Sequence, residues 1–354
     1  MKNLVDILDL TTEEIDKLIS VAEDIMSAPE KYRDACHGRI LATLFFEPST
    51  RTRLSFTSAM MSLGGSVLGF DQASSTSISK GETLSDTIRM VSTYSDIIAM
   101  RHPKEGAPIV ASGVSEVPVI NAGDGGHFHP TQTLTDLITI KEKLGRLDHL
   151  TVGVVGDLKY GRTVHSLISA MARYEGNSFV LISPEELMLP DYVKEEYLGD
   201  GKCPYVETTD LEGAIPKVDI IYMTRIQEER FADRGEYERL RDVYILDKSK
   251  LKLAKPTLSI LHPLPRVNEI NVDVDDDPRA HYFDQAMYGR YIRMALILML
   301  LDTKGVVDKR TKGEPDESLK CPNPHCITRT ERGIKKLFSE RRCIYCDQKA
   351  KTRG

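Results

Sequence analysis

The chain has 354 residues, of which 41% are hydrophobic and 28% charged, with a formal net charge of −6. This length accommodates two ordinary domains and a small appendage, and the composition is typical of a soluble globular protein. No apolar run is long enough to span a membrane, and the N-terminus lacks the apolar core of a signal peptide. We therefore expect a cytoplasmic protein without a membrane partner.

The first half of the chain alternates apolar strand patterns with amphipathic helix patterns. Thr11 and Glu14 are spaced as a capping box at the start of a helix over 11–26. Strands are expected at 39–46, 67–70, 97–100 and 117–121, and further helices at 50–63, 84–94 and 131–144. This alternation predicts a parallel sheet with helices on both faces.

The same pattern starts again after the helix over 131–144, near which we place the hinge between two domains. Strands are expected at 151–156, 179–182, 219–223 and 258–261, with helices at 164–173 and 288–301. The sequence therefore predicts an α/β protein of two consecutive doubly wound parallel-sheet domains joined by helices. Residues 303–320 contain Gly, Pro and mixed charges, which favours a linker.

One predicted strand-to-helix turn concentrates hydroxyl and guanidinium groups. In Ser49-Thr50-Arg51-Thr52-Arg53, Ser49 can cap the helix and the next three residues fall in its first turn. Arginine in a first turn opposes the helix dipole, so folding alone does not require it there. Backbone N–H groups, hydroxyls and a forked guanidinium suit a phosphate. The alternative is a capped helix with solvated arginines.

Cationic and hydrogen-bonding side chains follow nearly every predicted strand, at the edge where open parallel sheets bind ligands. They include Arg101; Asp124, His127, His129 and Gln132; Asp157, Lys159 and Arg162; Thr224, Arg225 and Gln227; and His262 and Arg266. Each alone could be a surface ion-pair partner or a structural histidine, but their shared edge predicts a site for anionic substrates.

The absent motifs narrow the chemistry. No glycine-rich G-x-G-x-x-G follows a strand and no phosphate loop is present, which disfavours dinucleotide and nucleoside-triphosphate chemistry. The sequence contains neither a serine-nucleophile elbow nor a cysteine after His262, so no covalent nucleophile is apparent. We expect a site that works by positioning and electrostatics, without a cofactor.

These motifs resemble those of the transcarbamoylase family over roughly residues 1–305. The matching segments are Ser49–Arg53, Arg101–Pro103, His129–Gln132 and His262–Arg266, in the family's order. Ornithine-specific members typically carry a cysteine after the late histidine. This chain instead has His262-Pro263-Leu264-Pro265, Asp157–Arg162 and Thr224–Gln227, which are similar to the aspartate branch.

The resemblance implies transfer of the carbamoyl group of carbamoyl phosphate to the amine of L-aspartate, a step of de novo pyrimidine biosynthesis. The implied carbamoyl phosphate ligands are Ser49, Thr50, Arg51, Thr52, Arg101, His129, Gln132 and the backbone carbonyls of Leu264 and Pro265. Of these, Thr52, Arg101 and His129 are expected near the carbonyl oxygen, and Arg51 is expected to act in catalysis with them by stabilising the transition state. The implied aspartate ligands are Arg162, Arg225, Gln227 and Leu264.

In the family, a loop corresponding to 74–81 reaches into a neighbouring subunit's active site and supplies a lysine and a serine. Lys80 matches the lysine, and Ser77 is our choice for the serine, with Ser75 and Ser79 as alternatives. The resemblance thus implies a homo-oligomer, minimally a trimer, with Lys80 acting in catalysis and aspartate binding and Ser77 in carbamoyl phosphate binding. The remaining alternatives are a transcarbamoylase for another amino acid, such as ornithine, and a silent assembly subunit.

The basic C-terminal tail contains two short-spaced cysteine pairs. Residues 321–354 carry nine Lys or Arg and three Asp or Glu, a net charge of +6, which leaves −12 for the rest of the chain. Four thiolates from two turns can close a tetrahedron around zinc, with iron or free thiols as alternatives. The expected ligands are Cys321, Cys326, Cys343 and Cys346, whereas Cys36 and Cys203 are isolated and expected to be inert.

The tail resembles the zinc domain of the separate regulatory chain of bacterial transcarbamoylases in the aspartate branch, without its nucleotide-binding domain. We hypothesise a fusion in which the tail packs on the acidic body and stabilises the trimer. A nucleic-acid-binding tail is the rival, but Phe338 and Tyr345 are its only aromatic residues. The expected parts are a carbamoyl phosphate domain at 1–133, an aspartate domain at 134–287, a helix at 288–305 that packs back on the first domain, a linker at 306–320 and a zinc module at 321–354.

Overall fold

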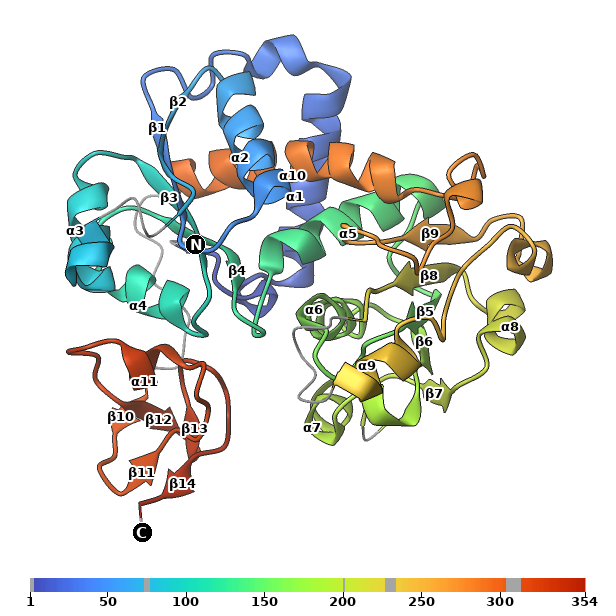
Figure 1. Cartoon of the computed structure of the whole chain (residues 1–354). Coiled ribbons are helices and arrows are strands. Elements are labelled where there is room, and N and C mark those ends of the chain that lie inside the picture. The colour runs from blue at the N-terminus through green and yellow to red at the C-terminus, as the bar shows by residue number, and fades with distance from the viewer. Residues whose placement is uncertain (1–2, 73–76, 200, 227–233, 304–312, 354) are drawn as a thin grey trace. The chain divides into compact units, whose positions relative to one another are not determined.

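The structure is a computed structural model that describes residues 3–72, 77–199, 201–226, 234–303 and 313–353. It divides into two compact units, each built on its own parallel sheet (Figure 1). Unit 1 comprises Met1–Thr131 and Arg290–Gly354, and unit 2 comprises Gln132–Gly289. The predicted fold class, two parallel-sheet α/β domains with a small C-terminal appendage, is confirmed.

The sheet of unit 1 has the strand order β2-β1-β3-β4, with all neighbours parallel. Its strands are β1 (Ile40–Phe45), β2 (Ser66–Phe70), β3 (Ile97–His102) and β4 (Val119–Asp124). Residues Leu41–Phe45 of β1 are all buried, as expected for a strand covered on both faces. The carboxyl ends of β1 and β3 are neighbours, because Phe45 is the register partner of Arg101.

Helices α1 (Thr12–Ser27), α2 (Thr50–Ser62), α3 (Leu84–Ser92) and α4 (Ala107–Val114) complete the N-terminal part of unit 1. The predicted capping box of α1 is confirmed, since Thr11 Oγ1 accepts from the Glu14 N–H and the Glu14 carboxylate accepts from the Thr11 N–H. Sequence reasoning missed α4, whose run Ala107–Val114 contains Pro, Gly and two Val and therefore has weak helix propensity.

The sheet of unit 2 has the order β7-β6-β5-β8-β9, again with parallel neighbours. Its strands are β5 (Thr151–Val155), β6 (Ser178–Ile182), β7 (Tyr205–Thr208), β8 (Ile220–Met223) and β9 (Ser259–Leu261). Sequence reasoning missed β7, an edge strand in which Tyr205 and Val206 are exposed, so its apolar side chains carry no pattern of burial.

The other helices of unit 2 are α6 (Arg162–Met171), α7 (Asp191–Val193), α8 (Leu211–Ala214) and α9 (Arg234–Leu240). Two long helices carry the chain between the units, α5 (Pro130–Leu144) and α10 (Tyr282–Asp302). Within unit 1, α10 lies against α2, because Arg293 donates to Ser55 Oγ at 3.1 Å and its guanidinium lies over the Phe56 ring. The first six residues of α10 precede the apolar run that predicted the helix, which explains the late predicted start.

The tail contains short elements: β10 (Glu314–Pro315), β11 (Leu319–Lys320), α11 (Ile327–Thr330), β12 (Leu337–Ser339), β13 (Arg342–Cys343) and β14 (Lys351–Thr352). They form a three-stranded sheet β10-β12-β13 and a two-stranded sheet β11-β14. Residues 306–312 of the expected linker lie outside the described residues, whereas β10 and β11 occupy its second half. Among the described residues, no helix has the length and apolar content of a membrane span.

Candidate active site and cysteine centre

The β1–α2 turn of unit 1 places two hydroxyls side by side. Ser49 occupies the N-cap position of α2, but its hydroxyl makes no capping bond and donates instead to Thr52 Oγ1 at 3.1 Å. The expected side-chain cap is therefore wrong, although the position is right. The first turn contains no acidic residue and no side-chain cap, so its N–H groups and dipole are suited to an external anion.

Two guanidinium groups meet at this edge of the sheet. Arg51 lies in the first turn of α2, and Arg101 is the fifth residue of β3. Desolvation and the neighbouring Arg101 charge lower the pKa of Arg51. Arg51 itself forms no ion pair with a described residue, so its guanidinium is suited to an anionic ligand.

Arg101 is held in place by a residue that sequence reasoning missed. Its Nη2 pairs with the Glu47 carboxylate, and its Nη1 lies 3.5 Å from the carbonyl oxygen of Ala122 on β4. Its side chain is only 13% exposed, and its Nε is buried with no hydrogen-bond partner among the described residues. Glu47 lies between the strand and the predicted phosphate turn, but only the three-dimensional register shows that it faces Arg101.

His129 is buried directly before α5, and its Nδ1 lies 3.4 Å from the Thr131 hydroxyl. The two other polar residues expected at this strand end, Asp124 and His127, have different roles. Asp124 is buried and accepts from the Gly106 N–H and the Asn121 amide at 2.8 and 2.9 Å. His127 binds Asp124 through one ring nitrogen and a tail residue, Asp347, through the other.

Unit 2 fixes the orientation of the Gln132 amide. The Gln132 Nε2 donates to Asp136 Oδ1 at 2.7 Å, which leaves the amide oxygen available as an acceptor. Asp136 is fully buried and also accepts from the Tyr222 hydroxyl at 3.0 Å and from the Gln285 amide at 2.5 Å. Asp136 and Gln285 carry no local sequence signal, because α5 and α10 bring them together across 149 residues.

The loop after β9 belongs to the same network. Gln285 Oε1 accepts from the His262 N–H at 3.1 Å, and His262 Nδ1 accepts from the Leu264 N–H at 2.8 Å. The other ring nitrogen of His262 lies 2.7 Å from the Glu269 carboxylate, and both side chains are buried. Burial disfavours the Glu269 anion, but the hydrogen bond from His262 outweighs it and lowers the pKa of Glu269.

This histidine-centred network shapes the backbone of the loop at Leu264, whose φ of 54° lies in the left-handed region. The carbonyl groups of Leu264 and Pro265 are thus presented by a loop that is anchored at both ends. Arg266 is committed elsewhere, since its guanidinium pairs with Asp275 and donates to the Tyr282 hydroxyl.

The two predicted aspartate-binding arginines of unit 2 lie at adjacent strand ends. Arg162 is the first residue of α6 after β5, and Arg225 follows β8, which pairs with β5. Thr224 joins the two loops, because its hydroxyl donates to the Val155 carbonyl at 2.8 Å and accepts from the Asp157 N–H at 3.1 Å. Both arginine residues are half-buried.

The remaining predicted site residues are not brought to these strand ends by any described contact. Lys80 is exposed at the end of a one-turn helix, Ser77–Lys80, and forms no ion pair with a described residue. The backbone of Ser77 begins that helix. Gln227 lies outside the described residues. The functions given above to all of these residues stay predictions.

Comparison with known proteins identifies the family. Residues 2–142 match the carbamoyl-P binding domain of aspartate/ornithine carbamoyltransferases, and residues 148–300 match their Asp/Orn binding domain. The chain belongs to the aspartate/ornithine carbamoyltransferase family.

Within this carbamoyltransferase family, the chain is similar to proteins of the aspartate type. It is 60% identical over 302 residues to the aspartate carbamoyltransferase catalytic subunit of Lachnoclostridium phytofermentans, covering 85% of this chain and 98% of the relative. The aspartate carbamoyltransferase catalytic subunit of Clostridium perfringens is 59% identical over 300 residues, which again cover 85% of this chain and 98% of the relative.

Solved structures show the same similarity. The catalytic subunit of M. jannaschii aspartate transcarbamoylase has a TM-score of 0.79 at 45% identity, over 85% of this chain and 98% of that one. Aspartate transcarbamoylase of Trypanosoma cruzi in complex with carbamoyl phosphate and aspartate has a TM-score of 0.79 at 38% identity, over 84% and 96%.

Beyond residue 300, where both carbamoyltransferase domain matches have ended, the tail brings four buried cysteines together. The sulfur atoms of Cys321, Cys326, Cys343 and Cys346 all lie within 4.8 Å of one another. The Cys321–Cys346 and Cys326–Cys343 distances are 3.5 and 3.8 Å. A tetrahedral zinc with bonds of about 2.3 Å separates its sulfur ligands by about 3.8 Å, so the cluster fits that metal.

The electrostatics of the cysteine centre are compatible with a bound cation. Hydrogen bonds from the other three thiols hold the pKa of Cys321 well below its usual range. Hydrogen bonds with Cys321, Cys326 and Cys343, together with burial, raise the pKa of Cys346 far above its usual range. A bound cation would offset the charge of several thiolates in this buried cluster.

The tail packs on unit 1 of the carbamoyltransferase body. Glu105, in the loop after β3, donates its N–H to the His325 carbonyl at 3.1 Å and accepts from the Ile327 N–H at 2.9 Å. Gly106 approaches Tyr345 so closely that a Cβ there would lie 2.3 Å from the Tyr345 carbonyl oxygen. Tail and body share one hydrophobic core, with Ile327, Phe338 and Tyr345 packed among residues of α3 and α4.

Proposed function

We propose that the chain catalyses transfer of the carbamoyl group of carbamoyl phosphate to the amine of L-aspartate, giving N-carbamoyl-L-aspartate and phosphate. The observation that carries this proposal is the 60% identity to an aspartate carbamoyltransferase catalytic subunit over 98% of that relative. The reaction supplies de novo pyrimidine biosynthesis.

The phosphate would bind at the β1–α2 turn of unit 1. Ser49, Thr50 and Thr52 offer hydroxyls, and Arg51 offers a fork of donors. Arg101, oriented by Glu47, would reach both the phosphate and the carbonyl oxygen. With Thr52 and His129, it would stabilise the oxyanion that forms when the amine attacks the carbamoyl carbon.

The carbamoyl NH₂ requires acceptors. Gln132 supports this role, because donation of its Nε2 to Asp136 directs the amide oxygen away from that carboxylate. The carbonyls of Leu264 and Pro265 would supply the other acceptors. The hydrogen bonds through Asp136, Gln285 and His262 support such a preorganised set.

In unit 2, Arg162 and Arg225 would bind the two carboxylates of aspartate, with Gln227 holding Arg225 or the substrate. Two guanidiniums for two carboxylates favour aspartate over ornithine, which has one carboxylate. The neutral aspartate amine would then attack, and the departing phosphate could accept its proton, since no side-chain base is apparent among the described site residues.

We also infer that the active site is shared between subunits of a trimer. Lys80 is exposed and has no ion-pair partner among the described residues of its own chain, which is compatible with its acting in a neighbour together with Ser77. The four cysteines would hold a structural zinc that orders the tail and has no part in the transfer.

A substrate panel tests the activity. Purified protein is assayed with carbamoyl phosphate and aspartate, ornithine or N-acetylornithine. We expect aspartate to be used at least a thousandfold better in kcat/KM than the others. Comparable turnover of ornithine would contradict the aspartate assignment, and no turnover of any amine would support a silent assembly subunit.

A pair of arginine variants tests the aspartate-binding residues. Arg225→Ala should raise KM for aspartate at least tenfold while KM for carbamoyl phosphate changes little. Arg241→Ala is the control, because Arg241 is an exposed arginine of the same unit that pairs with Glu238. Equal effects of the two variants on the aspartate KM would reject the proposed role of Arg225.

A further inference from the structure

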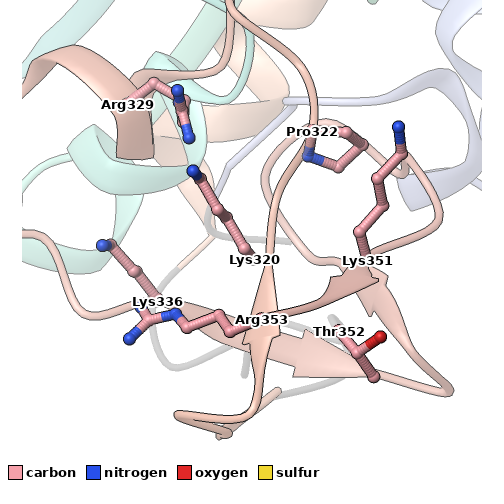
Figure 2. A pocket seen from close by; sticks show the side chains of 7 residues that line it. All are labelled: Lys320, Pro322, Arg329, Lys336, Lys351, Thr352 and Arg353. Carbon is pink, nitrogen blue, oxygen red and sulfur yellow. The ribbon is translucent and has the colours of Figure 1, made fainter.

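The tail contains a second cationic site, separate from the strand ends of the body. A hollow of about 700 Å³ is lined by Lys320, Pro322, Arg329, Lys336, Lys351, Thr352 and Arg353. Figure 2 shows the five cationic side chains extending from β11, α11, β14 and the segments beside β12 and β14. The volume is in the range of small-molecule sites.

The five cations of this hollow have no carboxylate partner among the described residues. No ion pair joins any of them to a described Asp or Glu, and the lining contains no acidic residue. Three tail carboxylates are engaged outside the lining: Glu331 accepts from the Leu84 N–H of the body at 2.8 Å, Asp347 binds His127, and Asp316 accepts from Ser318. The positive charge of the lining is thus not neutralised by an ion pair with a described residue.

The backbone itself places two of the lysines against each other. Lys320 and Lys351 are register partners across the antiparallel pair β11–β14, so their side chains leave the same face of that sheet. Arg353 is two residues from Lys351 and follows β14, with its N–H bonded to the Ser318 carbonyl at 2.8 Å. Like charges opposite each other in a sheet are destabilising, so folding alone does not explain this arrangement.

We propose that this hollow binds a small polyphosphate anion. Several clustered cations and the Thr352 hydroxyl suit a ligand with three or more adjacent negative charges better than a single carboxylate. The lining contains no aromatic ring on which a base could stack, so the site recognises the phosphate chain and not the nucleoside. The same absence disfavours a single-stranded nucleic acid, whose binding uses stacked bases.

Binding is measured on the full-length, zinc-loaded protein by calorimetry, with inorganic triphosphate, ATP and CTP at 150 mM salt. The test variant is Lys320→Gln/Lys351→Gln. The control is Lys335→Gln/Lys349→Gln, which removes the same charge from exposed lysines of the tail outside the hollow. Any triphosphate that binds at the strand ends of the body contributes equally in all three proteins.

We expect the unmodified protein to bind one triphosphate per chain at the hollow. The test variant should bind it at least tenfold more weakly or not at all, and the control variant should keep its dissociation constant within twofold of the unmodified protein. The three ligands should agree within threefold. Equal weakening in both variants would show nonspecific attraction and overturn the proposal. So would a tenfold preference between ATP and CTP, or a mixed 20-nucleotide DNA that displaces triphosphate and binds tenfold more tightly.

Discussion

The strand ends of unit 1 and the cysteine tail hold their charged groups by opposite means. Arg101 lies at the end of a strand whose preceding residues are buried, so the sheet and the Glu47 carboxylate fix its position. The tail has strands of two or three residues, and its four thiols lie together without a substantial sheet beneath them. Loss of one charged side chain in the body should therefore change the activity and leave the fold intact. Loss of one cysteine in the tail should instead prevent the tail from folding.

The largest effect is expected from removing the zinc that we propose for the tail. Structural zinc contributes on the order of 10 kcal/mol to small modules of this kind, which exceeds what such short strands supply. Chelation, or Cys343→Ser, should unfold the tail and leave the body folded. Limited proteolysis should then cut within 313–353, whereas the body stays intact.

Cys203→Ser is the matched control for that experiment. Cys203 is buried like the tail cysteines, but it is isolated in unit 2, where its thiol lies 3.0 Å from the Asn177 carbonyl. This variant should keep its zinc and a protected tail. A tail that stays protected after complete chelation would refute the view that metal holds it together.

The next effect concerns catalysis at the β1–α2 turn. Arg51→Ala should lower kcat about 10²–10³-fold, because loss of one donor to the transition state typically costs about 2.7–4 kcal/mol. Arg53→Ala is the control, since that arginine lies two residues away and pairs with the exposed Asp71 at 2.9 Å. Steady-state kinetics should separate the two, while their melting temperatures stay within about 2 °C of the parent.

A smaller effect is expected from Glu47→Gln, which keeps the shape of the Arg101 partner and removes its charge. A misplaced guanidinium should lower kcat/KM about tenfold, or about 1.4 kcal/mol, without changing the fold. Addition of guanidinium ions should not rescue this variant, whereas it should partly rescue Arg101→Ala. Unchanged kinetics would show that the sheet alone positions Arg101.

The smallest effect is a pH dependence of the contact between tail and body. Burial disfavours the His127 cation, but the Asp124 and Asp347 carboxylates outweigh it and hold the pKa of His127 well above its ordinary value of 6.5. A group whose pKa is raised by folding stabilises the folded state fully at pH values below its ordinary pKa. This stabilisation is lost as the pH rises through the raised pKa. Protection of the tail should thus be constant below pH 6.5 and fall in alkaline solution.

His127→Gln removes the titrating group of that contact. It should lower tail protection at pH 6 and abolish the alkaline decline, as measured by hydrogen exchange of residues 319–353. An alkaline decline that persists in this variant would assign the pH dependence to another group.

The sequence predicts which residues lie at the carboxyl ends of the strands, because the alternation of strands and helices indicates a parallel sheet whose carboxyl ends share one edge. Arg51, Arg101, Arg162 and Arg225 all lie at such ends in their own units. It also grouped the four cysteines that the structure brings together. These predictions needed only local patterns and the parallel topology.

The residues that hold the site were not predictable in this way. Asp136 and Gln285 are 149 residues apart, and Glu47 faces Arg101 across two strands. The strand pattern places His127 at the active-site edge, but the structure shows it bound to Asp347 of the tail. Such partners depend on packing between distant segments, for which a single sequence carries no periodic signal.

The close approach of Gly106 to Tyr345 has a consequence for protein engineering. The tail rests on a loop where even a methyl group would collide with its backbone, and Glu105 adds two main-chain hydrogen bonds there. A tail grafted onto another member of the family would therefore need the loop that contains Glu105 and Gly106 to be transferred with it. In chimeras that exchange residues 313–353 alone, the tail should not pack on the body. In chimeras that also carry residues 103–106 and His127, it should.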